Sequence, residues 1–182
     1  MKMLNLGCGP VILPEYLNVD IETPEVLTEW ASQAGKPAAE FDNGNFLQFD
    51  LLQPWSFVDD DSVDTIIANN FLEHFDHAGT HHILSECKRS LAPDGSVRGR
   101  VPDFRRVWEA YECDADWDWE PAVTWGPYPQ PAANALFNFC YAWGHKQIFT
   151  REMLYDRLSQ FGFSSVEIFQ QDVNYLFFFC RK

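Results

Sequence analysis

Residues that could hold a nucleoside follow three short apolar stretches near the start of the chain. Gly7-Cys8-Gly9 comes directly after the first stretch, and Asp20 ends the second. Glycines let the backbone approach a ligand closely, and a carboxylate can accept hydrogen bonds from both hydroxyls of a ribose. Asp50, after the third stretch, can meet the edge of an adenine together with its neighbouring amides. This order of residues predicts an adenosine site.

Polar residues also follow the next two apolar stretches, as Asn69-Asn70 and Pro102-Asp103. Ligands of a doubly wound sheet bind outside the carboxyl ends of its strands, so all five positions are expected along one edge. A dinucleotide site would need a third glycine opening a helix that holds the pyrophosphate. Gly9 is instead followed by Pro-Val-Ile-Leu-Pro, which leaves room for little helix before Tyr16. A ligand without phosphates fits better.

The elements that must position these residues alternate between strands and helices. Apolar runs bounded by turn residues predict strands over residues 3–6, 16–21, 46–51, 63–68, 97–101, 165–169 and 175–180. Apolar spacing and capping residues predict helices over residues 24–34, 74–91 and 150–161. The alternation predicts an α/β fold with a doubly wound, mostly parallel sheet and helices on both faces.

Length and composition limit the classes of protein. The chain has 182 residues, enough for a single domain over 1–182, and no apolar run approaches the roughly 20 residues of a membrane span. The chain contains 13 Lys and Arg residues and 27 Asp and Glu residues, and the resulting net charge of −14 disfavours a nucleic-acid partner. Five cysteines without a CxxC pair suit reduced thiols, and no secretory signal precedes the first strand, so a cytoplasmic location is expected.

One segment, residues 105–144, has no clear period. It is an irregular insertion that contains an acidic run over 112–120 and five of the seven tryptophans. Its aromatic residues either pack onto the domain or form a lid and a wall for a substrate. Aromatic faces would suit a sugar, and carboxylates would suit an amine.

The successive motifs resemble those of class I S-adenosylmethionine-dependent methyltransferases of the compact, single-domain kind. The resemblance rests on "LNLGCGP", "LNVDI", "FDLLQPW", "VDTIIANNFLEHF", "ILSECKRSLAPDG" and "RVPDF", with "HKQIFTREMLYDRLSQFGF" before the final hairpin. It implies a seven-stranded sheet whose last strand is antiparallel. It also implies S-adenosylmethionine as cofactor, with S-adenosylhomocysteine as product. The resemblance does not extend over residues 105–144.

Carried over by position, the resemblance implies a set of cofactor-binding residues. They are Gly7, Cys8, Gly9, Pro10, Asp20, Ile21, Asp50, Leu51, Asn69 and Asn70. Three features depart from the family pattern. Asn5 replaces an acidic residue, the first crossover helix is nearly absent, and Asn70 stands where relatives often have a histidine.

Three residues are candidates for acid–base chemistry at the acceptor. His74 is expected to start the helix after the fourth strand, where it could act as a base or only pack locally. His145 ends the aromatic segment, and Asp103 ends the fifth strand. Glu73, His77 and His81 have a spacing that could share one helix face. No later Cys or His cluster completes such a set, so no metal site is expected.

These observations favour methyl transfer to a small-molecule acceptor, with a sugar or nucleotide-sugar hydroxyl as one candidate. Two alternatives remain open at this point. Asn5 and the lack of an assured base leave room for a non-catalytic module that binds S-adenosylmethionine. A nucleic-acid methyltransferase is less favoured because of the negative charge.

Overall fold

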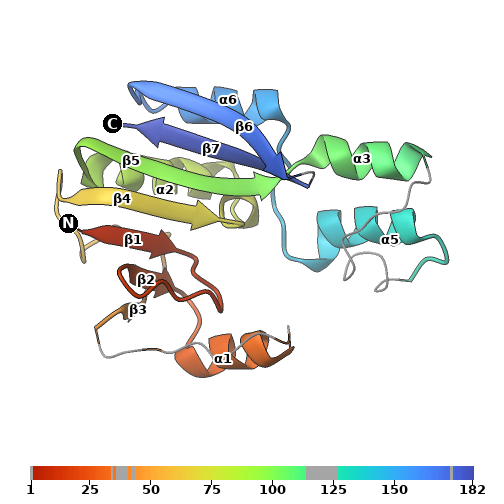
Figure 1. Ribbon diagram of the computed structural model, residues 1–182, viewed down its shortest axis with the longest axis horizontal. Coiled ribbons are helices and arrows are strands. Elements are labelled where there is room, and N and C mark those ends of the chain that lie inside the picture. Colours follow the sequence, from red (N-terminus) through yellow and green to blue (C-terminus); the bar gives the residue numbers. More distant parts are fainter. Residues whose placement is uncertain (1, 34, 36–40, 42–43, 114–126, 173) are drawn as a thin grey trace.

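The computed structural model describes residues 2–33, 35, 41, 44–113, 127–172 and 174–182. Seven strands form one sheet in the order β3-β2-β1-β4-β5-β7-β6 (Figure 1). The strands are β1 Met3–Leu6, β2 Leu17–Asp20, β3 Phe46–Gln48, β4 Val63–Asn69, β5 Leu91–Pro102, β6 Ser165–Asp172 and β7 Tyr175–Arg181. β7 runs antiparallel to β5 and β6, and the other strand pairs are parallel. The predicted α/β fold is confirmed.

β3 and β5 differ from their predicted bounds for local reasons. β3 ends at Gln48 instead of residue 51, because the chain then turns and the Asp50 carboxylate accepts a hydrogen bond from the Leu52 amide at 2.9 Å. β5 begins at Leu91, directly after the preceding helix. Leu91 pairs with Val63 and Ser96 with Thr65, so the intervening Pro-Asp-Gly residues bulge out of the ladder.

The helices formed by the described residues are α1 Pro24–Gln33, the 3-10 helix η1 Leu72–His74, α2 His77–Ser90, α3 Phe104–Cys113, α5 Pro131–Phe137, the π-helix η2 Asn138–Ala142 and α6 Arg151–Ser159. Two of them, η1 and η2, are single turns. The prediction that a helix starts at His74 was wrong. The helix α2 starts at His77, because the Asp76 carboxylate caps it by accepting a hydrogen bond from the Gly79 amide at 2.8 Å. His74 instead closes η1.

The segment predicted to be irregular contains regular structure at both ends. α3 and α5 lie side by side beyond the carboxyl ends of the central strands (Figure 1). Their contact has a small core of its own, centred on Val107, Ala135 and Phe139. Trp117, Trp119 and Trp125 lie outside the described residues. Because the polypeptide leaves β5 directly into α3, this helical pair starts at the edge where a ligand is expected.

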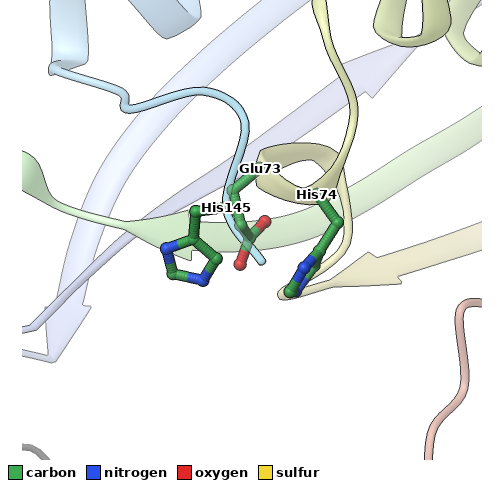
Figure 2. Close-up of side chains that lie close together, drawn as sticks. All are labelled: Glu73, His74 and His145. Atoms are coloured by element: carbon green, nitrogen blue, oxygen red, sulfur yellow. The ribbon is translucent and has the colours of Figure 1, made fainter. Parts of the chain in front are cut away.

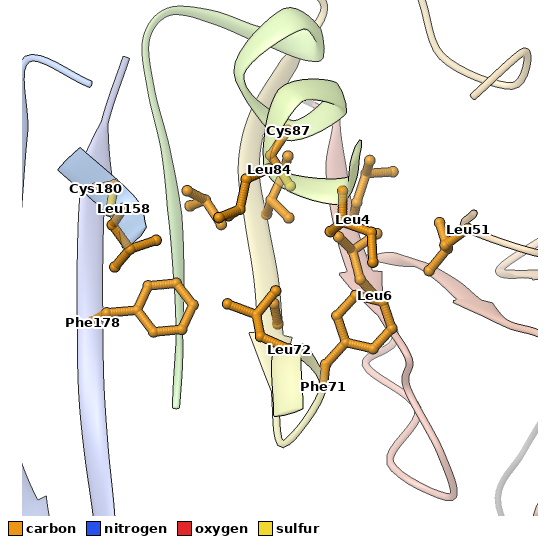
Figure 3. Packing of buried hydrophobic residues seen from close by; sticks show 14 of the residues in the cluster. Leu4, Leu6, Leu51, Phe71, Leu72, Leu84, Cys87, Leu158, Phe178 and Cys180 are labelled. Atoms are coloured by element: carbon orange, nitrogen blue, oxygen red, sulfur yellow. The ribbon is translucent and has the colours of Figure 1, made fainter. Parts of the chain in front are cut away.

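The main core packs two helices on the central strands. Leu84 and Cys87 of α2 and Leu158 of α6 face strand residues such as Leu4 and Phe178 (Figure 3). Apolar side chains at helical spacing on α2 and α6 thereby meet the alternating side chains of the sheet. This packing fixes the strand ends relative to one another. No helix among the described residues is both long and apolar enough to span a membrane.

The connection from β1 to β2 has no helix, and buried asparagines hold it instead. The Asn18 side chain is fully buried, and its amide nitrogen lies 3.0 Å from the Leu13 carbonyl, 2.9 Å from that of Tyr16 and 2.9 Å from that of Asn45. Its oxygen accepts from the Asn5 side chain and from the Leu13 amide, both at 2.9 Å. Asn5 also donates to the Val11 carbonyl. Asn5 therefore supports the loop that carries the glycines.

We expect Asn18→Ala to lower the free energy of unfolding by about 2–4 kcal/mol, because it leaves several buried backbone groups without partners. Urea denaturation measures the effect. Gln160→Ala is the matched control, because it removes an exposed amide that donates to the Asp156 carbonyl. The control should change stability by less than about 0.5 kcal/mol. Equal stability of the two variants would contradict the bracing role of Asn18.

Candidate functional site

A cavity of about 410 Å³ lies at the carboxyl ends of β1, β2 and β4. Seven of the ten residues predicted to bind a cofactor line it: Gly7, Gly9, Asp20, Ile21, Asp50, Leu51 and Asn70. Cys8, Pro10 and Asn69 do not line it. The remaining wall consists of Glu22, Trp30, Phe49, Leu52, Phe71, His74, Phe75 and Lys146. The residues that follow the first four strands therefore line one cavity.

Asp20 connects the end of β2 to the glycine loop. One carboxylate oxygen accepts a hydrogen bond from the Gly9 amide at 2.8 Å, and the other accepts from the Glu22 amide at 3.1 Å. The side chain is 7% exposed, so both bonds are largely shielded from water. Each oxygen retains a further lone pair that can accept from a ligand hydroxyl.

Gly7 is required by the close approach of an aromatic ring. Its φ is +54°, and a Cβ atom there would lie 2.2 Å from a ring carbon of Phe71. Phe71 follows β4 and lines the cavity next to His74. The glycine therefore lets the ends of β1 and β4 pack against each other, in addition to any contact with a ligand.

Cys8, between the two glycines, is inert packing. Its side chain is buried, and burial together with the Asp20 charge raises the pKa of the thiol to about 12. A thiol that remains protonated is a poor nucleophile. This agrees with its absence from the cavity wall.

The outer wall of the cavity includes an aromatic residue that the sequence analysis did not identify. Trp30 of α1 is 44% exposed and lines the cavity together with Ile21, which is 59% exposed. Asp50, on the same wall, accepts from the Leu52 amide at 2.9 Å and the Gln53 side chain at 3.3 Å. Trp30 belongs to no recognisable motif, and only the placement of α1 brings it to the site.

Glu73, His74 and His145 lie together (Figure 2), and of the three His74 lines the cavity. The possible ligand atoms of the three side chains are all within 4.8 Å of one another. Glu73 and His74 come from η1, and His145 comes from the segment that follows η2. The Glu73 carbonyl accepts from the amides of Lys146 at 2.8 Å and Gln147 at 3.1 Å, which holds that segment against η1.

Burial controls the charges of this cluster. Glu73 is 1% exposed, and burial raises its pKa to about 8, while the charge of the Arg100 guanidinium acts in the opposite direction. Burial and then the neighbouring His74 lower the pKa of His145 to about 4, and burial also lowers the pKa of His74. Both imidazoles are therefore neutral near pH 7.

Arg100 on β5 explains the orientation of Asn70. Its Nε donates to the Asn70 side-chain oxygen at 2.8 Å, and its guanidinium lies 4.3 Å from the centre of the Tyr175 ring. Asn70 has a positive φ of 51°, and its amide donates to the Arg100 carbonyl. The arginine at this strand position thereby fixes a residue of the cavity wall.

Two sequence-based groupings are separated by the structure. Asp103 lies at the start of α3, where its carboxylate accepts from the Arg105 amide at 3.1 Å, and it lines another cavity of about 190 Å³. It does not line the cavity that His74 lines. His77 and His81 are exposed on α2, whereas Glu73 is buried in η1, so these three do not share a helix face.

A second, larger cavity of about 850 Å³ lies between α3 and α5. Its wall is rich in aromatic rings, among them Phe104, Trp108, Tyr111, Tyr128, Phe137 and Tyr141. Ring contacts connect this cavity to the cluster of Glu73, His74 and His145. The ring centre of His145 lies 5.2 Å from that of Phe139, and the ring centre of Phe139 lies 5.8 Å from that of Phe104. His145 thus belongs to the cluster and is connected through Phe139 to the aromatic wall of this second cavity.

Comparison with solved structures shows the same fold at low sequence identity. A SAM-dependent methyltransferase from Archaeoglobus fulgidus is 15% identical with a TM-score of 0.63, over 100% of this chain and 86% of that one. One from Aquifex aeolicus is 13% identical with a TM-score of 0.56, over 100% and 81%. The chain spans about half the length of two longer neighbours.

A further neighbour was solved with ligands. The 1,6-didemethyltoxoflavin-N1-methyltransferase from Burkholderia thailandensis, with bound 1,6-didemethyltoxoflavin and S-adenosylhomocysteine, is 17% identical with a TM-score of 0.59. The alignment covers 100% of this chain and 70% of that one. No curated protein matches this chain.

A family model described as a methyltransferase domain matches residues 4–98, more than half of the chain. The matched part runs from β1 into β5 and contains every strand end that lines the cavity. The motifs, the strand order and this match agree, and S-adenosylmethionine is the cofactor. The chain belongs to the methyltransferase domain family and is a class I S-adenosylmethionine-dependent methyltransferase.

Proposed function

We propose that this enzyme methylates a hydroxyl of a small molecule, with a sugar or nucleotide sugar as the acceptor class. The observation that carries the proposal is the position of His74, which both lines the cofactor cavity and belongs to the cluster with Glu73 and His145. Polar groups able to assist loss of a proton therefore lie next to the cavity that takes the methyl donor.

In this proposal the cofactor lies across the strand ends. Asp20 accepts from the ribose hydroxyls, Asp50 and Leu51 meet the adenine, and Ile21 and Trp30 cover its outer face. The Gly7–Gly9 loop and Asn70 hold the methionine part. When bound there, the cofactor would supply its activated methyl group next to His74, which lines the same cavity.

The reaction is an in-line displacement. The acceptor oxygen attacks the methyl carbon, the carbon–sulfur bond breaks, and its electron pair remains on sulfur to give S-adenosylhomocysteine. The hydroxyl proton is released through the Glu73–His74–His145 cluster to solvent. The cofactor supplies the activated methyl group, so the main tasks of the protein are to align the acceptor and to assist loss of this proton.

The aromatic cavity between α3 and α5 supports this acceptor class. Stacked and edge-on rings bind the apolar faces of sugar rings well, while hydroxyls remain free for polar contacts. The net charge of −14 disfavours a nucleic acid. A small acceptor is in keeping with the ligand of the Burkholderia neighbour.

The five free cysteines fit the reducing conditions of a cytoplasm.

A screen for formation of S-adenosylhomocysteine tests the proposal, with free sugars, sugar phosphates, nucleotide sugars, phenols and amines as acceptors. We expect turnover with a sugar-containing class, and we expect Trp108→Ala to raise KM for that acceptor because Trp108 lines the aromatic cavity. Trp108 is 42% exposed, so the variant should fold.

Tyr155→Ala is the matched control for this variant, because Tyr155 is a half-exposed aromatic residue on α6, outside both cavities. Its KM should be unchanged. Turnover confined to phenols or amines would refute the acceptor class. Equal KM values for the two variants would refute the role of the aromatic cavity.

A further inference from the structure

We propose that Glu73, His74 and His145 hold a divalent transition-metal ion beside the cofactor cavity, which His74 lines. Their carboxylate oxygens and ring nitrogens lie within 4.8 Å of one another (Figure 2). Among the described residues these are the three that gather their ligand atoms in this way. In Figure 2 the carboxylate of Glu73 lies between the two imidazole rings.

The carboxylate of Glu73 lacks the partners that burial demands. Neither of its oxygens makes a hydrogen bond within the part of the chain that the structure describes, although the residue is 1% exposed. Burying the oxygens of a carboxyl group without hydrogen-bond partners costs free energy. Arg100, the cation that acts on it, already donates to Asn70 and faces the Tyr175 ring. Coordination to a cation would give these oxygens a partner.

His145 presents a second unsatisfied group. Its Nδ1 is buried and makes no hydrogen bond with any described residue. The ring is held by contacts with Phe139 at 5.2 Å and Trp143 at 5.9 Å, so it cannot turn freely toward water. An imidazole fixed in this way, beside a carboxylate and a second imidazole, is suited to coordination.

The surrounding hydrogen bonds hold the ligands before any ion binds. The Gln147 side chain donates to the Phe75 carbonyl at 2.7 Å and to the Thr80 hydroxyl at 2.5 Å. Together with the two amides that donate to the Glu73 carbonyl, these bonds fasten the segment carrying His145 onto η1 and α2. Such fixed geometry lowers the cost of assembling a site.

The ligand types select the kind of ion. Two imidazoles and one carboxylate suit Zn²⁺, Co²⁺, Mn²⁺ or Fe²⁺, whereas Mg²⁺ and Ca²⁺ prefer oxygen ligands. Three protein ligands leave coordination positions open. This part of the inference rests on the proposed function: because His74 lines the cofactor cavity, an open position would face the acceptor hydroxyl and favour its loss of a proton.

Metal binding is tested on the whole chain without cofactor or acceptor. The protein is freed of metal with a chelator and titrated with Zn²⁺ by calorimetry and with Co²⁺ by visible absorption. We expect one ion per chain, with ligand-field bands of nitrogen and oxygen coordination. Glu73→Gln and His145→Ala should each weaken binding at least about tenfold, and circular dichroism confirms that both fold.

The exposed histidines of α2 supply the matched control. His77 and His81 are four residues apart on one helix, a spacing that can bind ions adventitiously. His81→Ala should keep the affinity of the unaltered protein. If His81→Ala abolishes binding while Glu73→Gln does not, or if folded protein binds neither ion, the proposed metal site is overturned.

The binding assay and the activity assay fail separately. Absence of S-adenosylhomocysteine formation with every acceptor would count against the proposed function while the titrations remain valid. Absence of ion binding in a protein that still methylates would count against the metal site alone.

Discussion

Replacing His145 with alanine should lower turnover at least about 100-fold, the scale expected when a group that assists proton transfer is lost. The affinity for S-adenosylhomocysteine should stay within about twofold, because His145 does not line the cofactor cavity. Steady-state kinetics with a productive acceptor and calorimetry with S-adenosylhomocysteine measure the two quantities. A fall in kcat at constant cofactor affinity indicates a role on the acceptor side.

The control for this prediction is His81→Ala, which removes an exposed histidine whose ring contacts Phe161 on the outside of the domain. It should retain full turnover. His145 also packs against Phe139, so thermal unfolding must show that the His145 variant is folded at the assay temperature. A folded His145→Ala protein with normal turnover would show that the acceptor chemistry takes place elsewhere.

Asp20→Ala should weaken cofactor binding by about 1.5–3 kcal/mol, the scale of hydrogen bonds to a charged group, which is roughly 10- to 150-fold in Kd. The loss has two sources in the structure. The carboxylate lines the cavity, and it also accepts from the Gly9 amide of the glycine loop and from the Glu22 amide after β2. Calorimetric titration with S-adenosylhomocysteine measures the change.

Asp20→Asn separates these two sources, because an amide oxygen can still accept one backbone hydrogen bond while the charge is lost. It should bind the cofactor with an affinity between those of the unaltered protein and Asp20→Ala. Asp64→Ala is the matched control, since that carboxylate accepts from the Lys2 amide at the opposite edge of the sheet. Unchanged affinity in folded Asp20→Ala would rule out a ribose contact.

The strand ends were predictable because their signals are local. An apolar run that ends on a glycine, an aspartate or an asparagine marks both a buried strand and the polar residue after it. Gly7, Asp20, Asp50 and Asn70 were found in this way, and all line the cavity. The parallel order of the strands then brings their carboxyl ends to one edge without further information.

Helix starts and loop-borne residues were less predictable. His74 was expected to open a helix, but the Asp76 cap starts α2 at His77 and leaves His74 in η1. Asp103 was expected beside the other candidates, but the turn into α3 directs it to a separate cavity. Such choices depend on which carboxylate satisfies which backbone amide, and several nearby residues have that ability.

The sequence by itself therefore determined the fold and the residues at the strand ends, because hydrophobic periodicity and turn chemistry act over a few residues. The cofactor class followed from the resemblance of its motifs to a known family. Only the tertiary structure determined that Glu73, His74 and His145 form a cluster beside the cavity. Glu73 and His145 are far apart in the sequence, and they meet because the amides of Lys146 and Gln147 bind the Glu73 carbonyl. No local pattern encodes that contact, since it depends on where α3, α5 and η2 return the chain to the sheet.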